Sequence, residues 1–180
     1  MAELVYDENG RLLFTKEMKE EYTILFPTML PVHFGLMARI LETEGFHVEM
    51  LTTNHRGIVD EGLKYVHNDT CYPALLVIGQ LIDAVKSGKY DMHKVALLIT
   101  QTGGGCRASN YIHLLRKALV KAGYPQIPVA SLNFGSGKGQ RLPDDPAAGP
   151  PCAGLHLLRR YAVRFAQSGG TLRAREGGCR

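Results

Sequence analysis

The chain has 180 residues, of which 45% are apolar, enough to bury one hydrophobic core. No apolar run of about 18 residues occurs, and the first ten residues carry acids where a secretory signal carries basic residues, so we expect a cytoplasmic protein. Residues 1–137 hold 13 Lys and Arg against 14 Asp and Glu, while residues 138–180 hold 8 against 3, so the net charge of +4 lies in the C-terminal part. Because that part lacks interleaved aromatic residues and any nucleic-acid motif, we expect neither nucleic acid nor a membrane as a partner.

The first half of the chain alternates between extended and helical patterns. Residues 1–21 are expected to form an N-terminal hairpin and a linker, because Asn9 and Gly10 stand between two apolar runs as in a type I′ turn. Residues 22–27 read as a short buried strand, residues 32–45 as a helix that ends at Gly45, and residues 46–51 as a second strand. Residues 58–66 have the spacing of a short helix.

The same alternation continues to about residue 134. The stretch "NDTCYPALLVIGQLIDAVKSG" predicts a helix with Asn68, Asp69 or Thr70 as its N-cap, Pro73 in its first turn and Gly88 at its end. A strand over residues 95–100, a helix over 107–122 and a strand over 127–132 follow. Residues 22–134 are therefore predicted to form one α/β domain, a parallel sheet of about four strands with helices on both faces.

The remaining residues, 135–180, break this pattern. The stretch "GSGKGQRLPDDPAAGPP" has the composition of a loop, and the last residues have little apolar content. We expect an irregular, basic and disordered tail.

The stretch "QTGGGCRASNY", which follows the strand over residues 95–100, is one candidate phosphate-binding turn. Gly103, Gly105 and Ala108 satisfy the pattern G-x-G-x-x-A, whose glycines let the backbone approach a pyrophosphate at a helix N-terminus. Against this, no Asp or Glu occurs over residues 92–143 to bind a ribose, and Arg107 stands where a P-loop needs Lys. A nucleotide- or CoA-binding module that uses Gly103, Gly104 and Gly105 therefore remains the alternative.

An iron-sulfur site is the second interpretation of this turn. Cys71 and Cys106 each follow polar residues and precede a predicted helix, whose N-terminal amides and dipole favour a thiolate. If both helices begin at the same edge of the sheet, the two cysteines approach each other. Four cysteines are too few for a disulfide scaffold, and neither Cys71 nor Cys106 belongs to a compact motif such as C-x-x-C. The spacing of the two cysteines therefore also fits two buried thiols, or two thiols without a function, at the starts of helices.

Polar residues near these turns are candidate cofactor-binding side chains. His33 lies at the first strand-to-helix turn and so belongs to the same predicted edge, although a lone His there is more often a capping or core residue. Tyr72, Asn110 and Tyr111 are candidate hydrogen-bond donors to a cluster, although each suits packing or a surface position equally well. No catalytic residue is identified.

The two cysteine segments carry a family resemblance. The stretches "VDEGLKYVHNDTCYPALLVIGQLIDAVKSGKYD" and "ITQTGGGCRASNYIHLLRKAL" closely resemble the region related to 2-hydroxyacyl-CoA dehydratase subunits in anaerobic proteins described as acyl-CoA dehydratase activase-related. The resemblance runs from about Asp7 to Asn133. It implies a Rossmann-like domain, with Cys71 and Cys106 as ligands of a [4Fe-4S] or related cluster.

The resemblance also implies a reaction and partners. In the dehydratases the cluster lies beside an acyl-CoA, and an ATP-driven activator supplies one electron that makes a ketyl radical and lets water leave. The implied partners are an ATPase activator module or a dehydratase-like subunit, and acyl-CoA. In a complete assembly this chain would contribute to an ATP-dependent radical lyase or to its electron-donating activator.

The chain departs from this family in two respects. Family members are much longer, so this chain is expected to be a fragment that is not catalytically complete, with no recognisable third cluster ligand and no ATPase motif of its own. Cys152, another chain or an exogenous ligand would have to complete the cluster. The family-like sequence also stops at Gly135. Suitable codons for the stretch "RRYAVRFAQSGGTLR" can be read in the neighbouring reading frame as "GDTLCALLNQVAPYE". This second sequence resembles the continuation of the family better than the encoded tail does. A frame-shifted tail predicts that Cys152 and Cys179 have no evolved role.

Overall fold

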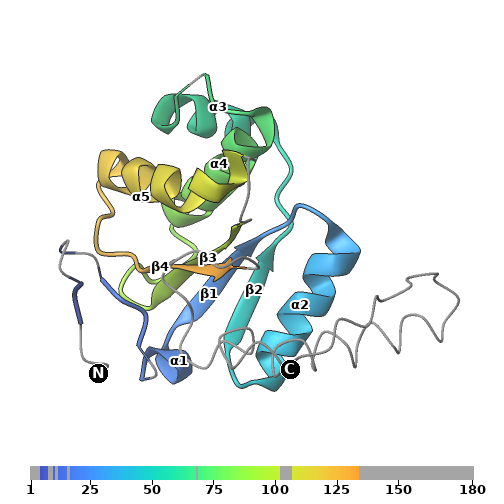
Figure 1. The fold of residues 1–180 in the computed structure, drawn as a ribbon, viewed down its shortest axis with the longest axis vertical. Helices are drawn as coiled ribbons and strands as arrows, with labels where there is room; N and C mark the ends of the chain where they lie inside the picture. The colour runs from blue at the N-terminus through green and yellow to red at the C-terminus, as the bar shows by residue number, and fades with distance from the viewer. Residues whose placement is uncertain are drawn as a thin grey trace, which may run out of the picture. The chain divides into compact units, whose positions relative to one another are not determined.

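The computed structural model describes residues 5–7, 10, 12–15, 17–67, 69–101 and 107–133. Four of its strands form one parallel sheet with the order β2-β1-β3-β4, and helices lie on its two faces (Figure 1). The elements in chain order are α1 (Met18–Glu21), β1 (Thr23–Pro27), α2 (Pro31–Thr43), β2 (His47–Leu51), α3 (Arg56–Tyr65), α4 (Tyr72–Lys86), β3 (Val95–Gln101), the short 3-10 helix η1 (Arg107–Asn110), α5 (Tyr111–Ala122) and β4 (Val129–Asn133). The predicted α/β fold is confirmed.

The strand order contains a reversal between β1 and β3. The chain passes from β1 through α2 to β2 on one side, then returns through α3 and α4 to β3 on the other side of β1. The loops that leave β1 and β3 therefore run to opposite faces of the sheet. In open α/β sheets, ligands bind in the crevice that such a reversal creates at the carboxyl ends of the strands.

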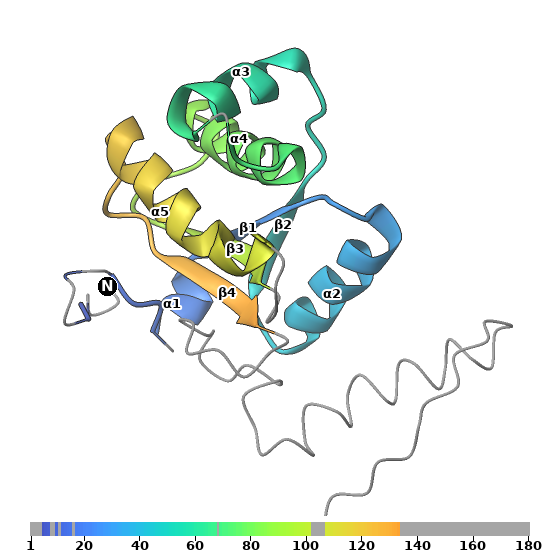
Figure 2. The same cartoon turned by 45° about the horizontal axis from the view of Figure 1, so that its top comes forward.

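Alternate residues of the strands face two separate hydrophobic clusters. Leu25, Leu97 and Ile99 point to the face covered by α4 and α5, whereas Phe26 and Leu98 point to the face covered by α2. Figure 2 shows α4 and α5 on one side of the sheet and α2 on the other. Because both faces are buried, these strands have continuous apolar runs in place of an alternating pattern.

Helix α3 forms an outer layer on α4, away from the sheet (Figure 1). A Cβ atom added to Gly62 of α3 would lie 2.5 Å from the carbonyl oxygen of Leu75 in α4. The two helices therefore pack closely enough that only glycine fits at their crossing. Lys86 of α4 also forms an ion pair with Glu61 of α3, with 2.8 Å between Nζ and Oε2.

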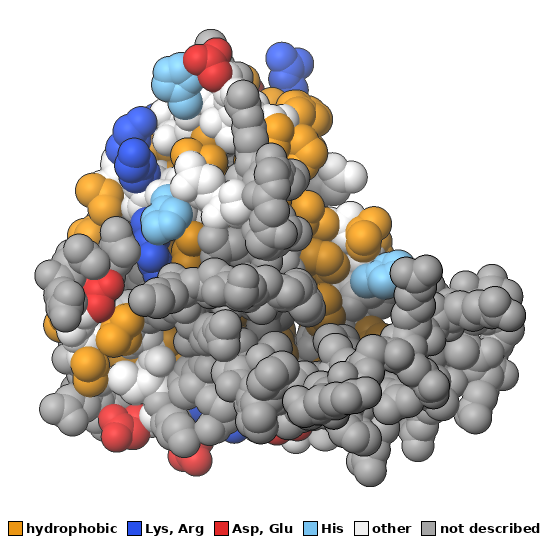
Figure 3. All heavy atoms as spheres, in the orientation of Figure 1, with side chains coloured by type: hydrophobic (Ala, Val, Ile, Leu, Met, Phe, Trp, Pro, Cys, Tyr) orange, Lys and Arg blue, Asp and Glu red, His pale blue; other side chains and the backbone are white. Residues whose placement is uncertain are grey.

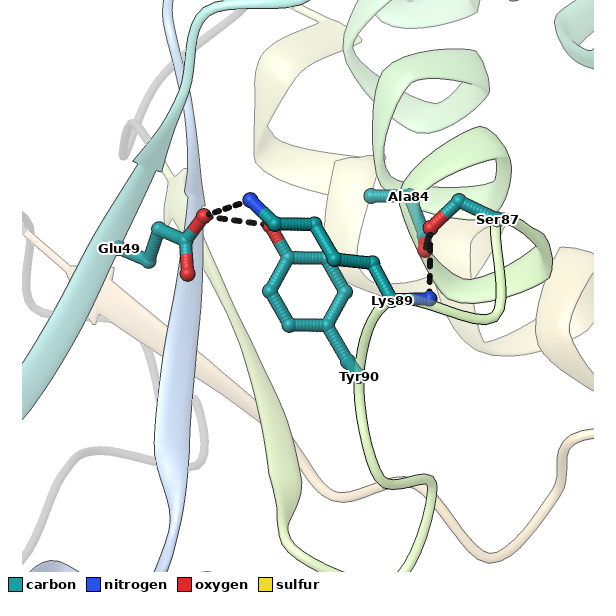
Figure 4. A network of polar contacts seen from close by, with 5 residues as sticks. All are labelled: Glu49, Ala84, Ser87, Lys89 and Tyr90. Atoms are coloured by element: carbon teal, nitrogen blue, oxygen red, sulfur yellow. Dashed lines mark hydrogen bonds and ion pairs between the residues drawn. The ribbon is translucent and has the colours of Figure 1, made fainter.

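A polar network joins β2 to the loop that follows α4 (Figure 4). Oε1 of Glu49 accepts hydrogen bonds from Nζ of Lys89 at 2.7 Å and from the hydroxyl of Tyr90 at 2.6 Å. These bonds, first that from Lys89, hold the pKa of Glu49 below its ordinary value, and burial raises the pKa of Tyr90. The network links the edge strand β2 to the loop between α4 and β3.

Several helices begin or end at other residues than the sequence predicts. The N-cap of α4 is Cys71, not Asn68, Asp69 or Thr70, because a turn closed by the hydrogen bond from the N–H of Thr70 to the carbonyl of His67 precedes Cys71, whose own backbone is extended. The predicted helix over residues 107–122 begins with the 3-10 turn η1, and the charged stretch before β1 contains the unexpected short helix α1. Gly45 and Gly88 follow their helices with φ of 85° and 70°, as expected of C-terminal glycines.

The two ends of the chain are described only in part. Tyr6 and Leu12 form an isolated antiparallel bridge, but Asn9 lies outside the described residues, so the predicted type I′ turn stays a prediction. The predicted tail over residues 135–180 also lies outside them. Among the described residues, no helix combines the length and the apolar character that crossing a membrane requires.

Candidate functional site at the carboxyl edge of the sheet

The carboxyl edge of the sheet is the candidate site, because the chain leaves β1 and β3 there toward opposite faces. β1 ends at Pro27 and leads into α2, which has His33 exposed in its first turn. β3 ends at Gln101 and leads through residues 102–106 to η1 and α5. The turns at His33 and at residues 102–106 thus follow strands at the reversal of the sheet, whereas the turn at Cys71 follows the helix α3.

Gln80 of α4 joins the ends of β1 and β2 from inside the domain. Its Oε1 accepts a hydrogen bond from the backbone N–H of Thr28 at 3.1 Å. Its Nε2 donates to the carbonyl oxygens of Leu51 at 3.1 Å and Thr53 at 2.9 Å. The sequence reasoning missed this residue, although one amide within the apolar run "ALLVIGQLIDAV" was a signal, since a buried amide needs partners.

Cys71 occupies the N-cap of α4. Its backbone is extended, with φ of −61° and ψ of 143°, and its carbonyl oxygen accepts a hydrogen bond from the N–H of Ala74 at 3.0 Å. The thiol is half-buried against the hydrophobic cluster beneath α4 and α5. Cys71 therefore stands at the positive dipole end of a helix of 15 residues, but its side chain makes no hydrogen bond to the amides of that helix.

The thiol of Cys71 meets the start of α5. Its Sγ lies 3.1 Å from the hydroxyl oxygen of Tyr111, the first residue of α5, whose side chain is only 4% exposed. Cys106 precedes Tyr111 by five residues and is bonded to Arg107, the first residue of η1, but Cys106 itself lies outside the described residues. The structure therefore brings Cys71 to the start of the helix that follows the second cysteine.

The other predicted site residues have different positions. Gly103, Gly104 and Gly105 lie outside the described residues. Asn110 is the N-cap of α5 and is exposed, without a hydrogen bond from its side chain to the helix. His33 belongs to α2, which covers the face of the sheet opposite α4 and α5, so the structure does not join it to the pair formed by Cys71 and Tyr111.

Two neighbours of Cys71 in the sequence do not share its contact with Tyr111. Tyr72 is 61% exposed and points away from the core. His67 pairs with Asp69, with 3.2 Å between Nδ1 and Oδ2, and both side chains are exposed. Of the three candidate donors, the structure thus brings Tyr111 to the sulfur of Cys71.

An apolar surface adjoins the carboxyl end of β1. Met29, Leu30, Val32 and Leu36 are exposed between 39% and 72% around the start of α2. Figure 3 shows hydrophobic side chains over the upper end of α2 and on the adjoining surface toward α3 and α4. A cavity of about 510 Å³ that Arg116, Lys117 and Lys121 help to line lies elsewhere, between α5 and the start of β4.

The donor atoms of this edge fit an iron-sulfur cluster in kind. Cys71 offers a cysteine sulfur at a helix N-terminus, and iron-sulfur clusters use cysteine sulfur as their ligand. In the described ranges, however, no three His, Cys, Asp or Glu side chains gather closely enough to bind a metal ion. A cluster on Cys71 therefore needs ligands from residues outside those ranges, such as Cys106, or from a partner.

The fold and this edge define an α/β protein with an all-parallel sheet of the doubly wound type. Comparisons of the chain with protein-family models, with curated proteins and with solved structures found no match.

Proposed function

We propose that this chain is an iron-sulfur-cluster-binding fragment of a redox protein related to the 2-hydroxyacyl-CoA dehydratases and their activase-related relatives. Cys71 and Cys106 are the proposed ligands of a [4Fe-4S] or related cluster. The observation that carries the proposal is the contact of 3.1 Å between Sγ of Cys71 and the hydroxyl of Tyr111. This contact joins the N-terminus of α4 to the start of α5, the helix that follows Cys106 in the sequence.

The position of Cys71 suits a cysteine ligand. It is the N-cap of α4, at the end of the helix where the dipole favours a negatively charged group. The neighbouring hydrophobic cluster, which includes Val77 and Ile78, keeps water from the protein side of the thiol. A bound cluster would supply one-electron chemistry, and the residues of this edge would hold it and limit its contact with water.

A partner is part of the proposal. Two cysteines leave a cluster incompletely ligated, so another chain or an exogenous ligand completes it. The partner implied by the resemblance is an ATPase activator module or a dehydratase-like subunit, with acyl-CoA as the substrate of the assembly. The exposed apolar surface around Leu30 and Val32, at the carboxyl end of β1, offers such a partner a contact area. Because cluster thiolates need a reducing compartment, we also propose a cytoplasmic location.

Anaerobic reconstitution with iron and sulfide tests the proposal. We expect the wild-type chain to bind both elements and to absorb broadly near about 400 nm, as iron-sulfur charge transfer does. The variant Cys71→Ser/Cys106→Ser should lose the bound iron and sulfide. The matched control is Cys152→Ser/Cys179→Ser, which replaces the same number of cysteines and should bind as much iron as the wild type.

Two results would contradict these ligands. One is full iron and sulfide content in the Cys71→Ser/Cys106→Ser variant. The other is loss of iron only in the Cys152→Ser/Cys179→Ser control. Circular dichroism of each variant shows that the fold is retained, so that lost binding reports on the ligands alone.

A nucleotide- or CoA-binding function is the second candidate, favoured by the position of residues 102–106 after β3 at the reversal of the strand order. Glycines there would let backbone N–H groups approach a phosphate. Calorimetry of the metal-free protein with NAD, ATP and CoA separates the two candidates. Tight binding of one of these ligands would favour the second function, whereas the cluster proposal expects none.

A further inference from the structure

The cavity of about 510 Å³ between α5 and the start of β4 has a lining that is apolar in part. Ligand pockets in proteins have volumes of about 300–1,000 Å³, so this cavity is large enough for a small organic molecule. Its apolar lining residues are Leu12, Leu119, Val120, Pro125, Ile127 and Val129. This part of the lining suits the apolar part of a ligand, because packing there removes apolar surface from water.

The polar part of the same lining is positively charged. Arg116, Lys117 and Lys121 of α5 contribute cationic side chains to it, and His113 adds an imidazole. Figure 3 shows Lys or Arg side chains together with a His side chain over α5. No Asp or Glu is among the described lining residues, and none occurs in the sequence over residues 92–143. The cavity therefore favours an anionic ligand.

The helix α5 arranges these cations around the cavity. Arg116 donates a hydrogen bond from Nη2 to the carbonyl oxygen of Val129 at 3.2 Å, which holds its side chain between α5 and β4. Lys117 and Lys121 are exposed and lie four residues apart on one face of the helix, where like charges repel each other. In the described part of the chain, neither lysine has an ion pair. The dipole of α5 stabilises a cation in its last turn, as at Lys121, but not at Lys117, one turn earlier.

We propose that this cavity binds a small phosphate monoester with an apolar organic part, at a site separate from Cys71 and independent of the proposed cluster. A phosphate monoester carries close to two negative charges at neutral pH and has three acceptor oxygens. The guanidinium of Arg116 suits such oxygens through its planar set of donors, and Lys117 and Lys121 supply two further positive charges. The apolar lining packs against the organic part of the ligand.

An NMR titration of the metal-free, nitrogen-15-labelled full chain with phenyl phosphate tests the proposal. Inorganic phosphate, which lacks the ring, and phenol, which lacks the charge, are the two partial ligands. We expect phenyl phosphate to shift the amide signals of residues 113–121 and 127–129 to saturation, and to bind more tightly than either partial ligand. Binding should weaken as the salt concentration rises, because exposed cations are screened.

A pair of variants assigns the binding to these cations. Lys117→Gln/Lys121→Gln should lower the affinity for phenyl phosphate by about 3- to 30-fold. The matched control is Arg39→Gln/Lys64→Gln, which removes two positive charges from exposed positions of α2 and α3 and should leave the affinity unchanged. The spectrum of each variant shows that its fold is retained.

Three results would overturn the proposal. The first is an equal loss of affinity in both variants, and the second is inorganic phosphate binding as tightly as phenyl phosphate. The third is a set of shifts confined to residues outside the lining of the cavity. The comparison of the three ligands uses the wild type alone, so it decides the matter even where a variant does not fold. None of these results depends on whether the chain binds iron.

Discussion

Gly79 of α4 lies directly against Gly62 of α3. A Cβ atom at Gly79 would lie 3.0 Å from the backbone nitrogen of Gly62, and it would come closer still to the carbonyl oxygen of Ile58. Backbone atoms of a packed helix cannot move aside as the end of a flexible side chain can. This contact therefore determines how closely the outer helix α3 approaches α4, whose N-terminus carries Cys71.

The first prediction concerns this helix contact. Gly79→Ala should lower the free energy of unfolding by about 1–3 kcal/mol, because the added methyl group forces the two helices apart. Gly35→Ala is the matched control, since a Cβ atom at this position of α2 meets nothing within 4 Å. Alanine at position 35 should be neutral or stabilising by up to about 1 kcal/mol through its higher helix propensity. Equal stability of the two variants in urea unfolding would contradict the assigned close packing.

The second prediction concerns the amide that joins the strand ends. Gln80→Leu should destabilise the domain by about 1–3 kcal/mol, because it removes the side-chain partner of a buried carbonyl at Leu51 and of partly buried bonds to Thr28 and Thr53. Gln126→Leu makes the same substitution at an exposed turn and should change stability little. Thermal unfolding of both variants checks the difference, and a Gln80→Leu protein as stable as the control would refute the structural role of the amide.

The third prediction is a pH dependence at β2. The folded pKa of Glu49 is lowered from 4.5, first by the hydrogen bond from Lys89, so the stabilisation from its charge is present above pH 4.5 and is lost as the pH falls through the lower folded value. Glu49→Gln should therefore cost about 0.5–1 kcal/mol near neutral pH, a small value because the group is partly exposed to screening solvent.

The measurement for Glu49 is urea unfolding between neutral pH and about pH 3, a range that brackets ordinary carboxyl pKa values. The difference between wild type and Glu49→Gln should shrink toward the acid end. Glu42→Gln, at an exposed position of α2, should not lower stability at either end. A cost of Glu49→Gln that is independent of pH would show that packing, and not charge, makes its contribution.

The fourth prediction concerns metal removal after reconstitution. Chelation should remove the absorbance near about 400 nm while the far-ultraviolet circular dichroism is retained. The reason is that buried side chains such as Leu97, Leu98 and Ile99 pack the two faces of the sheet without help from a cluster. Unfolding that accompanies chelation would instead show that the cluster is required for the fold.

The sequence was sufficient to predict most of the fold. Strands and helices alternate with lengths that allow parallel crossovers, and apolar runs such as "VALLIT" mark strands buried on both faces. The predicted start of α4 was wrong because local signals compete there. Three polar residues before Cys71 all suit an N-cap. Only the backbone of the folded chain shows that Cys71 itself is the N-cap. The helix α1 was missed because four residues are too few to show a helical apolar period.

The candidate site was predictable only as a set of residue types. The sequence by itself determined that two cysteines precede helices and that glycines follow the strand β3. Only the tertiary structure decided that Tyr111, and not Tyr72, lies at the sulfur of Cys71, and that Gln80 joins the strand ends. The physical reason is that these partners are 27 to 52 residues apart in the chain, so their contact depends on how α4 and α5 pack over the sheet and not on any local pattern.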